Sequence, residues 1–279
     1  MIRTDVRDKT QEIIEEFKIN RSVRQLYKKY NCGNSVIRNI LKKSGIYNEY
    51  VQKKYGNHEN SDYEILLDLE NKQSLYWLGF MAGDFCIGDN GSITCELGIT
   101  DYMHLVKFKE FVNTENPIRV RTQVRKTGNS SDLCSLCICS MRLKNGLQEL
   151  GITPRKSLTL NIENKILINS KDFWRGLIDA NGSLCTYQDT KGYLVYEISL
   201  SGTYNILNKF SEYIEKNIMP VTRKIRNVVK ICHIKFSGRS AYKLIKHFYG
   251  DAEIYLERKY NKSVEMLKGL EEKFKDRLE

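Results

Sequence analysis

The chain has 279 residues, 41% of them hydrophobic and 28% charged, which is the composition of a folded protein of about two domains and excludes wholesale disorder. Forty-five lysine and arginine residues against 34 acidic residues give a formal charge of +11, which favours a polyanionic partner. No apolar run approaches the roughly 18 residues of a membrane span, and the N-terminus carries no signal core, so we expect a cytoplasmic protein with no membrane partner.

Apolar residues at helical spacing predict three short helices near the N-terminus, over 10–17, 22–30 and 34–44. Ser22 and Asn34 are suitable N-caps, and Gly33 offers the freedom of a tight turn, so a helix-turn-helix is the expected arrangement. The alternative is a module that contacts another protein. If the unit reads DNA, the third helix faces the major groove with Asn34, Ser35, Arg38, Asn39 and Lys42.

Charge favours the DNA interpretation, because residues 1–60 carry +6 of the total charge. The polar stretch that follows has no clear periodicity and several turn-forming residues, so we interpret it as a linker. We therefore expect a helix-turn-helix domain over 1–47, a linker over 48–62, and two further halves over 63–165 and 166–279.

The remainder of the chain contains an internal repeat with an offset of 97 residues. Aligning Gly79 with Gly176 also aligns Trp77 with Trp174. Segments of period two and further helices follow each copy, which predicts the order helix-β-β-helix-β-β-helix twice and an α+β fold class.

Small residues stand four positions apart in each copy, at Gly79 and Gly83 and at Gly176 and Ala180. Because little or no side chain intervenes at such positions, two helices that carry them can cross at close range. Such a crossing would place Asp84 and Asn181, five residues beyond the first small residue of each copy, side by side.

These segments resemble the LAGLIDADG homing endonucleases in their single-chain, two-motif form. Residues 173–184 (FWRGLIDANGSL) match the signature closely and residues 76–87 (YWLGFMAGDFCI) more loosely, and the resemblance spans about 63–268. It implies a pseudo-two-fold body, with two antiparallel DNA-binding saddles. It further implies a monomeric, nucleoid-associated enzyme that cleaves a long, specific site in double-stranded DNA.

The resemblance also implies a metal centre. In the family, the last acidic residue of each motif helix binds divalent ions, and here these positions are Asp84 and Asn181. Mg²⁺ or Mn²⁺ is the expected cofactor, because hard cations prefer oxygen ligands. A basic residue from each half lies near the scissile phosphates in the family, and Lys156 and Lys259 are the matching candidates.

Two positions depart from the family pattern. Phe85 stands where glycine is usual, and it fits only if the backbone keeps a negative φ. Asn181 replaces the second carboxylate with an amide. Impaired cleavage and nicking of one strand are both open, and so is binding without cleavage, as a DNA-binding transcriptional regulator or an intron RNA maturase.

Basic side chains recur along the predicted strands. In 117–126, alternation predicts a core face of Ile118, Val120, Thr122 and Val124, and an opposite face for DNA. The alternative is a solvated sheet face. The residues expected to contact DNA are Arg119, Arg121, Gln123 and Arg125 in this strand, and Arg223, Arg226, His233 and Lys235 in the second-half hairpin.

Three cysteines in one predicted strand, Cys134, Cys137 and Cys139, have a spacing that invites a zinc site. In a strand, Cys134 faces away from the other two, so the three sulfurs cannot converge on one ion. We therefore expect no zinc.

Overall fold

The computed structural model of the chain describes residues 5–20, 22–47, 61–124, 128–220, 223–228 and 231–274. The chain forms two compact units, Met1–His58 and Glu59–Glu279, each with its own hydrophobic core. Most of the stretch predicted to be a linker, residues 48–60, lies outside the described residues. None of the helices described combines the length and the apolarity that a membrane span needs.

The first unit consists of short helices around a small apolar core: α1 (Asp5–Asp8), α2 (Thr10–Asn20), α3 (Val23–Lys29) and α4 (Asn34–Lys43). The last three lie where the sequence predicts helices, and α1 is an addition. The Ser22 hydroxyl accepts a hydrogen bond from the Gln25 N–H at 3.3 Å, as an N-cap does.

The turn between α3 and α4 differs from the expectation in its details. Gly33, not Asn34, is the N-cap of α4, and its φ of −69° is open to any residue. The left-handed residue of the turn is Asn31, with a φ of 44°. Asparagine tolerates this conformation because its short polar side chain can bond locally, so it performs the role that we assigned to glycine.

The second unit repeats one order of elements twice. The first half contains α6 (Lys72–Asp84), β1 (Phe85–Ile87), β2 (Ser92–Gly98), α7 (Tyr102–Phe111), β3 (Arg119–Val124), β4 (Ser130–Cys139) and α8 (Met141–Glu149). The second half contains α10 (Lys171–Asn181), β5 (Gly182–Gln188), β6 (Leu194–Gly202), α11 (Tyr204–Asn217), β7 (Arg226–Val228), β8 (Ile231–Ser237) and α12 (Arg239–Tyr249). The predicted order and the α+β class are confirmed.

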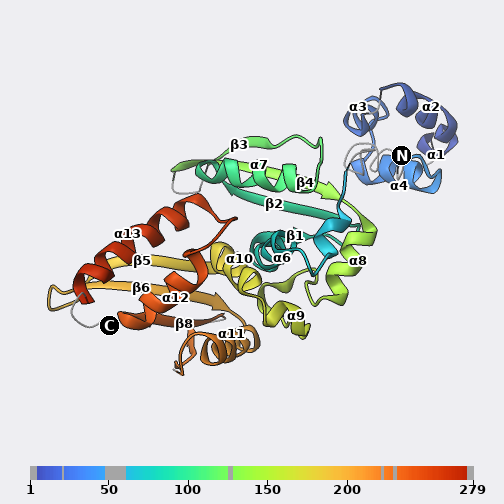
Figure 1. The fold of residues 1–279 in the computed structure, drawn as a ribbon. Helices are drawn as coiled ribbons and strands as arrows, with labels where there is room; N and C mark the ends of the chain where they lie inside the picture. Colours follow the sequence, from blue (N-terminus) through green and yellow to red (C-terminus); the bar gives the residue numbers. More distant parts are fainter. Residues whose placement is uncertain are drawn as a thin grey trace. The chain divides into compact units, whose positions relative to one another are not determined.

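Shorter elements and one long helix complete this unit. They are η1 (Glu64–Leu67), η2 (Ile99–Asp101), η3 (Lys156–Leu158), α9 (Lys165–Ile168) and α13 (Glu257–Phe274). Figure 1 shows α6 and α10 next to each other between the two sheets, and they pack along their lengths.

Each half holds a four-stranded antiparallel sheet, with the strand orders β1-β2-β4-β3 and β5-β6-β8-β7. Helices α7 and α8 pack against the first sheet, and α11 and α12 pack against the second. In β2, buried Ile93, Cys95 and Leu97 alternate with more accessible residues, so one face of the sheet supplies the core and the other is open.

The predicted core face of residues 117–126 holds for Ile118, which is partly buried and packs against the core, and is wrong for Val120, Thr122 and Val124. Val120 and Val124 are 57% and 70% exposed, and all six residues of the strand are exposed. The reason is the position of β3 at the edge of the sheet, where it pairs with Ser130–Ser135 of β4. Since β2 pairs with β4 only from Leu133 onward, residues 122–124, half of β3, extend past the packed part of the sheet.

Phe85 meets the condition that we set for it. Its φ is −84°, its side chain is buried, and it forms the first residue of β1. The chain therefore leaves α6 in an extended conformation that does not require glycine.

Candidate active site

Helices α6 and α10 touch backbone to backbone at two glycines. A methyl group added at Gly79 would lie 1.9 Å from the Phe173 carbonyl oxygen, and one added at Gly176 would lie 2.0 Å from the Tyr76 carbonyl oxygen. Only glycine can occupy these positions at this helix separation, because real Cβ atoms do not approach other atoms so closely.

The crossing continues one turn later and ends at the two motif positions. A methyl group at Gly83 would lie 2.3 Å from Ala180 Cβ and 3.3 Å from Asn181 Oδ1. The Asn181 amide therefore lies against the turn of α6 that carries Asp84. Both side chains are partly accessible, and each is the last residue of its helix.

Asp84 lies in a partly buried position with cations around it. Burial raises the pKa of its carboxyl group to about 6, although the charges of Lys259, Arg258 and Lys156 act to lower it. Within the described ranges the carboxylate accepts no hydrogen bond and has no cation within ion-pair distance, so its oxygens are open to a ligand.

The two candidate lysines bind equivalent backbone positions. The Lys259 ammonium donates to the carbonyl oxygens of Ile178, Asp179 and Gly182, at 2.8, 2.6 and 2.8 Å. The Lys156 ammonium donates to the carbonyl oxygen of Phe85, which corresponds to Gly182 in the repeat. Each lysine therefore binds the C-terminal end of the motif helix of its own half, where the helix dipole favours a cation.

Both lysines are buried, with exposed fractions of 6% for Lys156 and 5% for Lys259. Burial lowers the pKa of Lys259 to about 8, and it also lowers the pKa of Lys156. The positive charges of the two buried lysines lower the pKa of Asp84. Both ammonium groups donate their hydrogen bonds to backbone carbonyl oxygens of the protein.

Asp179 is a second carboxylate of this region, and it is fully buried. It accepts hydrogen bonds from the Tyr76 hydroxyl at 2.7 Å, the Tyr249 hydroxyl at 2.6 Å and the Leu256 N–H at 2.8 Å. Tyr76 belongs to the first half, and Tyr249 and Leu256 belong to the second. Asp179 therefore joins the halves from within, a role that sequence reasoning missed although the residue stands inside the motif.

The exposed face of the first sheet carries the predicted basic residues of β3, except that Arg125 lies outside the described residues. Arg121 donates from Nε and NH2 to the Glu96 carboxylate of β2, at 3.0 and 2.8 Å. Inspection of β3 alone could not reveal this acid, because the sheet register brings it from another strand. Arg119 and Gln123 extend from the same side of β3 as Arg121.

In the second sheet, Arg226, His233 and Lys235 share the open face. His233 Nδ1 lies 2.8 Å from the Ser201 hydroxyl, and Lys235 forms an ion pair with Glu197 at 2.9 Å. Arg223 precedes β7 and donates to the Ser240 hydroxyl at 3.0 Å. The strand predicted over 221–229 is shorter, and residues 221, 222 and 229 lie outside the described ranges.

In the first unit, α4 has one buried face and one exposed face. Ile37 and Leu41 are fully buried in the core of the unit. The five side chains that we expect to face DNA are all exposed: Asn34, Ser35, Arg38, Asn39 and Lys42.

The cysteines of β4 lie as alternation predicts. Cys134 is buried in the core, whereas Cys137 and Cys139 are partly exposed on the opposite face of the strand. Their sulfurs do not converge.

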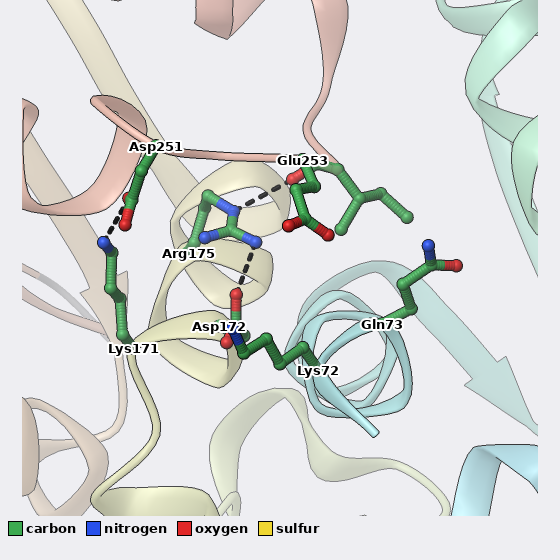
Figure 2. A pocket seen from close by; sticks show the side chains of 8 residues that line it. Lys72, Gln73, Lys171, Asp172, Arg175, Asp251 and Glu253 are labelled. Atoms are coloured by element: carbon green, nitrogen blue, oxygen red, sulfur yellow. Dashed lines mark hydrogen bonds and ion pairs between the residues drawn. The ribbon is translucent and has the colours of Figure 1, made fainter. Parts of the chain in front are cut away.

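A pocket lies at the other end of the crossed helices, about 18 Å along α6 from Asp84. Figure 2 shows its cations Lys72, Lys171 and Arg175 beside the acids Asp172, Asp251 and Glu253. Arg175 donates to Asp172 at 2.6 Å and to the Ile254 carbonyl oxygen at 2.9 Å, and Lys171 pairs with Asp251. Four of its six charged side chains form these two ion pairs with each other, and the pocket is separate from the Asp84 site.

Comparison with known proteins identifies the fold. The sequence matches no protein-family model and no curated protein. Among solved structures, the LAGLIDADG homing endonuclease I-GzeII in complex with its DNA target has a TM-score of 0.51 and 12% identity, covering 75% of this chain and 93% of that one. The homing endonuclease I-WcaI bound to its DNA recognition sequence has a TM-score of 0.51 and 16% identity, covering 74% and 95%. The body of this chain has the fold of the single-chain LAGLIDADG homing endonucleases.

Proposed function

We propose that the chain is a monomeric homing endonuclease that binds a long, specific site in double-stranded DNA and hydrolyses phosphodiesters there with a divalent metal. The observation that carries this proposal is the helix crossing, which sets the Asn181 amide against Gly83, the residue before Asp84, between two sheets with basic open faces. DNA that follows both sheets would pass across this point.

The side chains present suit a hard divalent cation such as Mg²⁺ or Mn²⁺. Asp84 offers carboxylate oxygens without a competing hydrogen bond, and Asn181 offers an amide oxygen that lies against the neighbouring Gly83. No group of three or more acidic, histidine or cysteine side chains able to hold a metal occurs among the residues described, so phosphate and water oxygens would complete the ligand set. A bound ion would polarise the phosphodiester and activate water.

The residues of the chain contribute position and charge to this chemistry. Asp84 must be ionised to bind a cation, and its pKa of about 6 makes this state dominant at neutral pH. Lys156 and Lys259 fix the ends of the motif helices and place positive charge near the phosphates. Asn181 supplies no charge, so we propose that metal binding is weakened and that cleavage is impaired or restricted to one strand.

Asn181 also favours a second candidate function. A chain that retains both basic sheets and loses one metal-binding carboxylate can hold its site without cutting it, as a DNA-binding transcriptional regulator does. We propose that α4 enters the major groove as the second helix of a helix-turn-helix. DNA binding by the first unit is compatible with both functions. With either function, we propose that the chain acts in the cytoplasm, associated with the nucleoid.

A cleavage assay separates the two candidates. The full chain first selects its site from random duplexes in EDTA, and the site is then placed in a supercoiled plasmid and incubated with Mg²⁺ or Mn²⁺. We expect nicked or linear product from the native chain, no product from Asp84→Asn, and native behaviour from the exposed control Asp89→Asn. Cleavage by Asp84→Asn would contradict the proposed centre, and tight binding by the native chain without any product would favour the regulator.

A further inference from the structure

Arg258 and Lys259 stand next to each other in the first turn of α13, and they bind opposite halves of the body. Lys259 binds the end of α10 in its own half. Arg258 donates from Nε to both carboxylate oxygens of Asp101, at 3.1 and 2.9 Å, and Asp101 ends η2 in the first half. The start of α13 therefore bridges the two halves beside the crossing.

Arg258 differs from the two lysines in its accessibility. Its side chain is 55% exposed, whereas its partner Asp101 is buried. Because Asp101 uses only Nε, the two terminal amino groups of the guanidinium form no hydrogen bond within the described part of the chain. A planar guanidinium with two free amino groups matches the geometry of a phosphate.

The position of Arg258 relative to Asp84 supports the same function. The charge of Arg258 lowers the pKa of Asp84, second only to Lys259 among the cations and ahead of Lys156. Asp101 also influences that pKa, in the opposite direction. Geometry agrees, because Arg258 directly precedes Lys259, whose ammonium binds the Asp179 and Gly182 carbonyl oxygens at the end of the crossing. Unlike the two lysines, Arg258 is exposed.

The equivalent residue of the first half lacks this arrangement. Arg155 precedes Lys156 as Arg258 precedes Lys259, but its side chain is 88% exposed. Its partner Asp89 is itself 78% exposed and lies at 3.5 Å. An exposed pair of this kind holds a side chain weakly, whereas a buried carboxylate bound through two oxygens fixes an arginine.

We propose that Arg258 is a catalytic residue that contacts the DNA phosphate beside Asp84, and that Asp101 positions it. The two terminal amino groups donate to the phosphate oxygens, and the positive charge stabilises the phosphate during hydrolysis. Arg258, a residue of the second half, thereby acts on the same phosphate as Asp84 of the first half. This inference rests on the proposed function, since it requires DNA across the helix crossing.

The asymmetry has a consequence for the two strands. The carboxylate of Asp84 and the anchored arginine act on one phosphate, while the other motif position has the neutral Asn181 and the weakly held Arg155. The strand beside Asp84 is therefore the one that the chain is equipped to cut.

The test measures whether the loss of the Arg258 side chain and the neutralisation of one phosphate weaken DNA binding independently. The full chain binds its selected duplex in EDTA, and single central phosphates are replaced by neutral methylphosphonates. We expect one position at which the replacement weakens binding by the native chain about tenfold and leaves binding by Arg258→Gln almost unchanged. Arg155→Gln, the matched control, retains the native sensitivity at that position.

Two more variants separate contact from folding. Arg258→Lys keeps the charge, so it should retain part of the sensitivity, and Asp101→Asn should reduce it because the arginine loses its anchor. Circular dichroism checks that each variant is folded. Equal methylphosphonate sensitivity of native chain and Arg258→Gln at every central phosphate would overturn the inference alone, and failure of the native chain to bind any duplex would overturn the proposed function as well.

Discussion

At the scale of single residues, Asp84 shows the conflict between function and stability. Burial raises its pKa to about 6, against 3.8 for an ordinary aspartate, and three cations only partly offset this. An acid whose pKa is higher in the folded chain than in the unfolded chain binds more protons when folded, so stability falls as pH rises between the two values. The charge that the proposed metal binding needs therefore costs free energy of folding.

This cost predicts that Asp84→Asn stabilises the chain. At pH 7 the free energy of unfolding should rise by up to about 3 kcal/mol, because the variant has no carboxyl group to ionise. At pH 4 the native carboxyl group is protonated in the folded state, and the gain should nearly vanish. Urea denaturation at the two pH values measures the difference, and equal gains at pH 4 and pH 7 would contradict the raised pKa.

Asp179 has the opposite role, since its buried carboxylate is satisfied by three hydrogen bonds. Asp179→Ala should cost about 3–5 kcal/mol of stability, because it leaves the Tyr249 hydroxyl and the Leu256 N–H without a partner and removes a counter-charge of Lys259. The Tyr76 hydroxyl would keep only its bond to His104. Tyr249→Phe removes one of the three bonds to Asp179 and should cost about 1–2 kcal/mol. Similar urea midpoints for Asp179→Ala and the native chain would refute this role.

At the scale of elements, the crossing of α6 and α10 sets the geometry of the site. Gly79→Ala should cost about 3 kcal/mol or more, because its methyl group collides with a backbone carbonyl and must push the helices apart. Gly98→Ala is the matched control, since its methyl group would meet only the Thr100 hydroxyl at 3.6 Å and its φ is −62°. Thermal denaturation compares them, and an equal loss for both would show that the close contact is unimportant.

The sequence predicted the elements that depend on local pattern. Spacing of small residues indicated the crossing, and alternation separated Cys134 from Cys137 and Cys139. Alternation failed for the side chains of β3. Their exposure depends on how far the neighbouring strands of the sheet extend, and the sequence of β3 alone does not contain that information.

The contacts that sequence reasoning missed join residues far apart in the chain. Glu96 reaches Arg121 through the sheet register, and Asp101 reaches Arg258 across 157 residues. Such pairs follow from the packing of the two halves, and no local spacing predicts them.

At the scale of the whole molecule, the charge of +11 is distributed over both units. The body, Glu59–Glu279, accounts for +4, and part of its cationic surface is paired with Glu96 and Glu197. The first unit, Met1–His58, carries the remaining +7, so its contribution to DNA affinity should be large.

Substitution of Arg38→Gln together with Lys42→Gln tests this contribution on the full chain. We expect weaker DNA binding, a salt slope reduced by about 2 and a shorter footprint, with any cleavage position unchanged. Lys9→Gln with Lys18→Gln changes the charge of the same unit equally outside α4 and serves as the control. An unchanged footprint for the α4 variant would place DNA recognition elsewhere.

We propose that Asp84 and Asn181 form a metal centre with one carboxylate missing. The most direct measurement compares the native chain with Asn181→Asp on a supercoiled plasmid that carries the selected site, in Mg²⁺. We expect Asn181→Asp to produce linear DNA where the native chain produces nicked circles or no product, and we expect that adding Asp84→Asn to the variant removes this activity. Linear product that survives the loss of Asp84, or no gain from Asn181→Asp despite tight binding, would contradict this proposal.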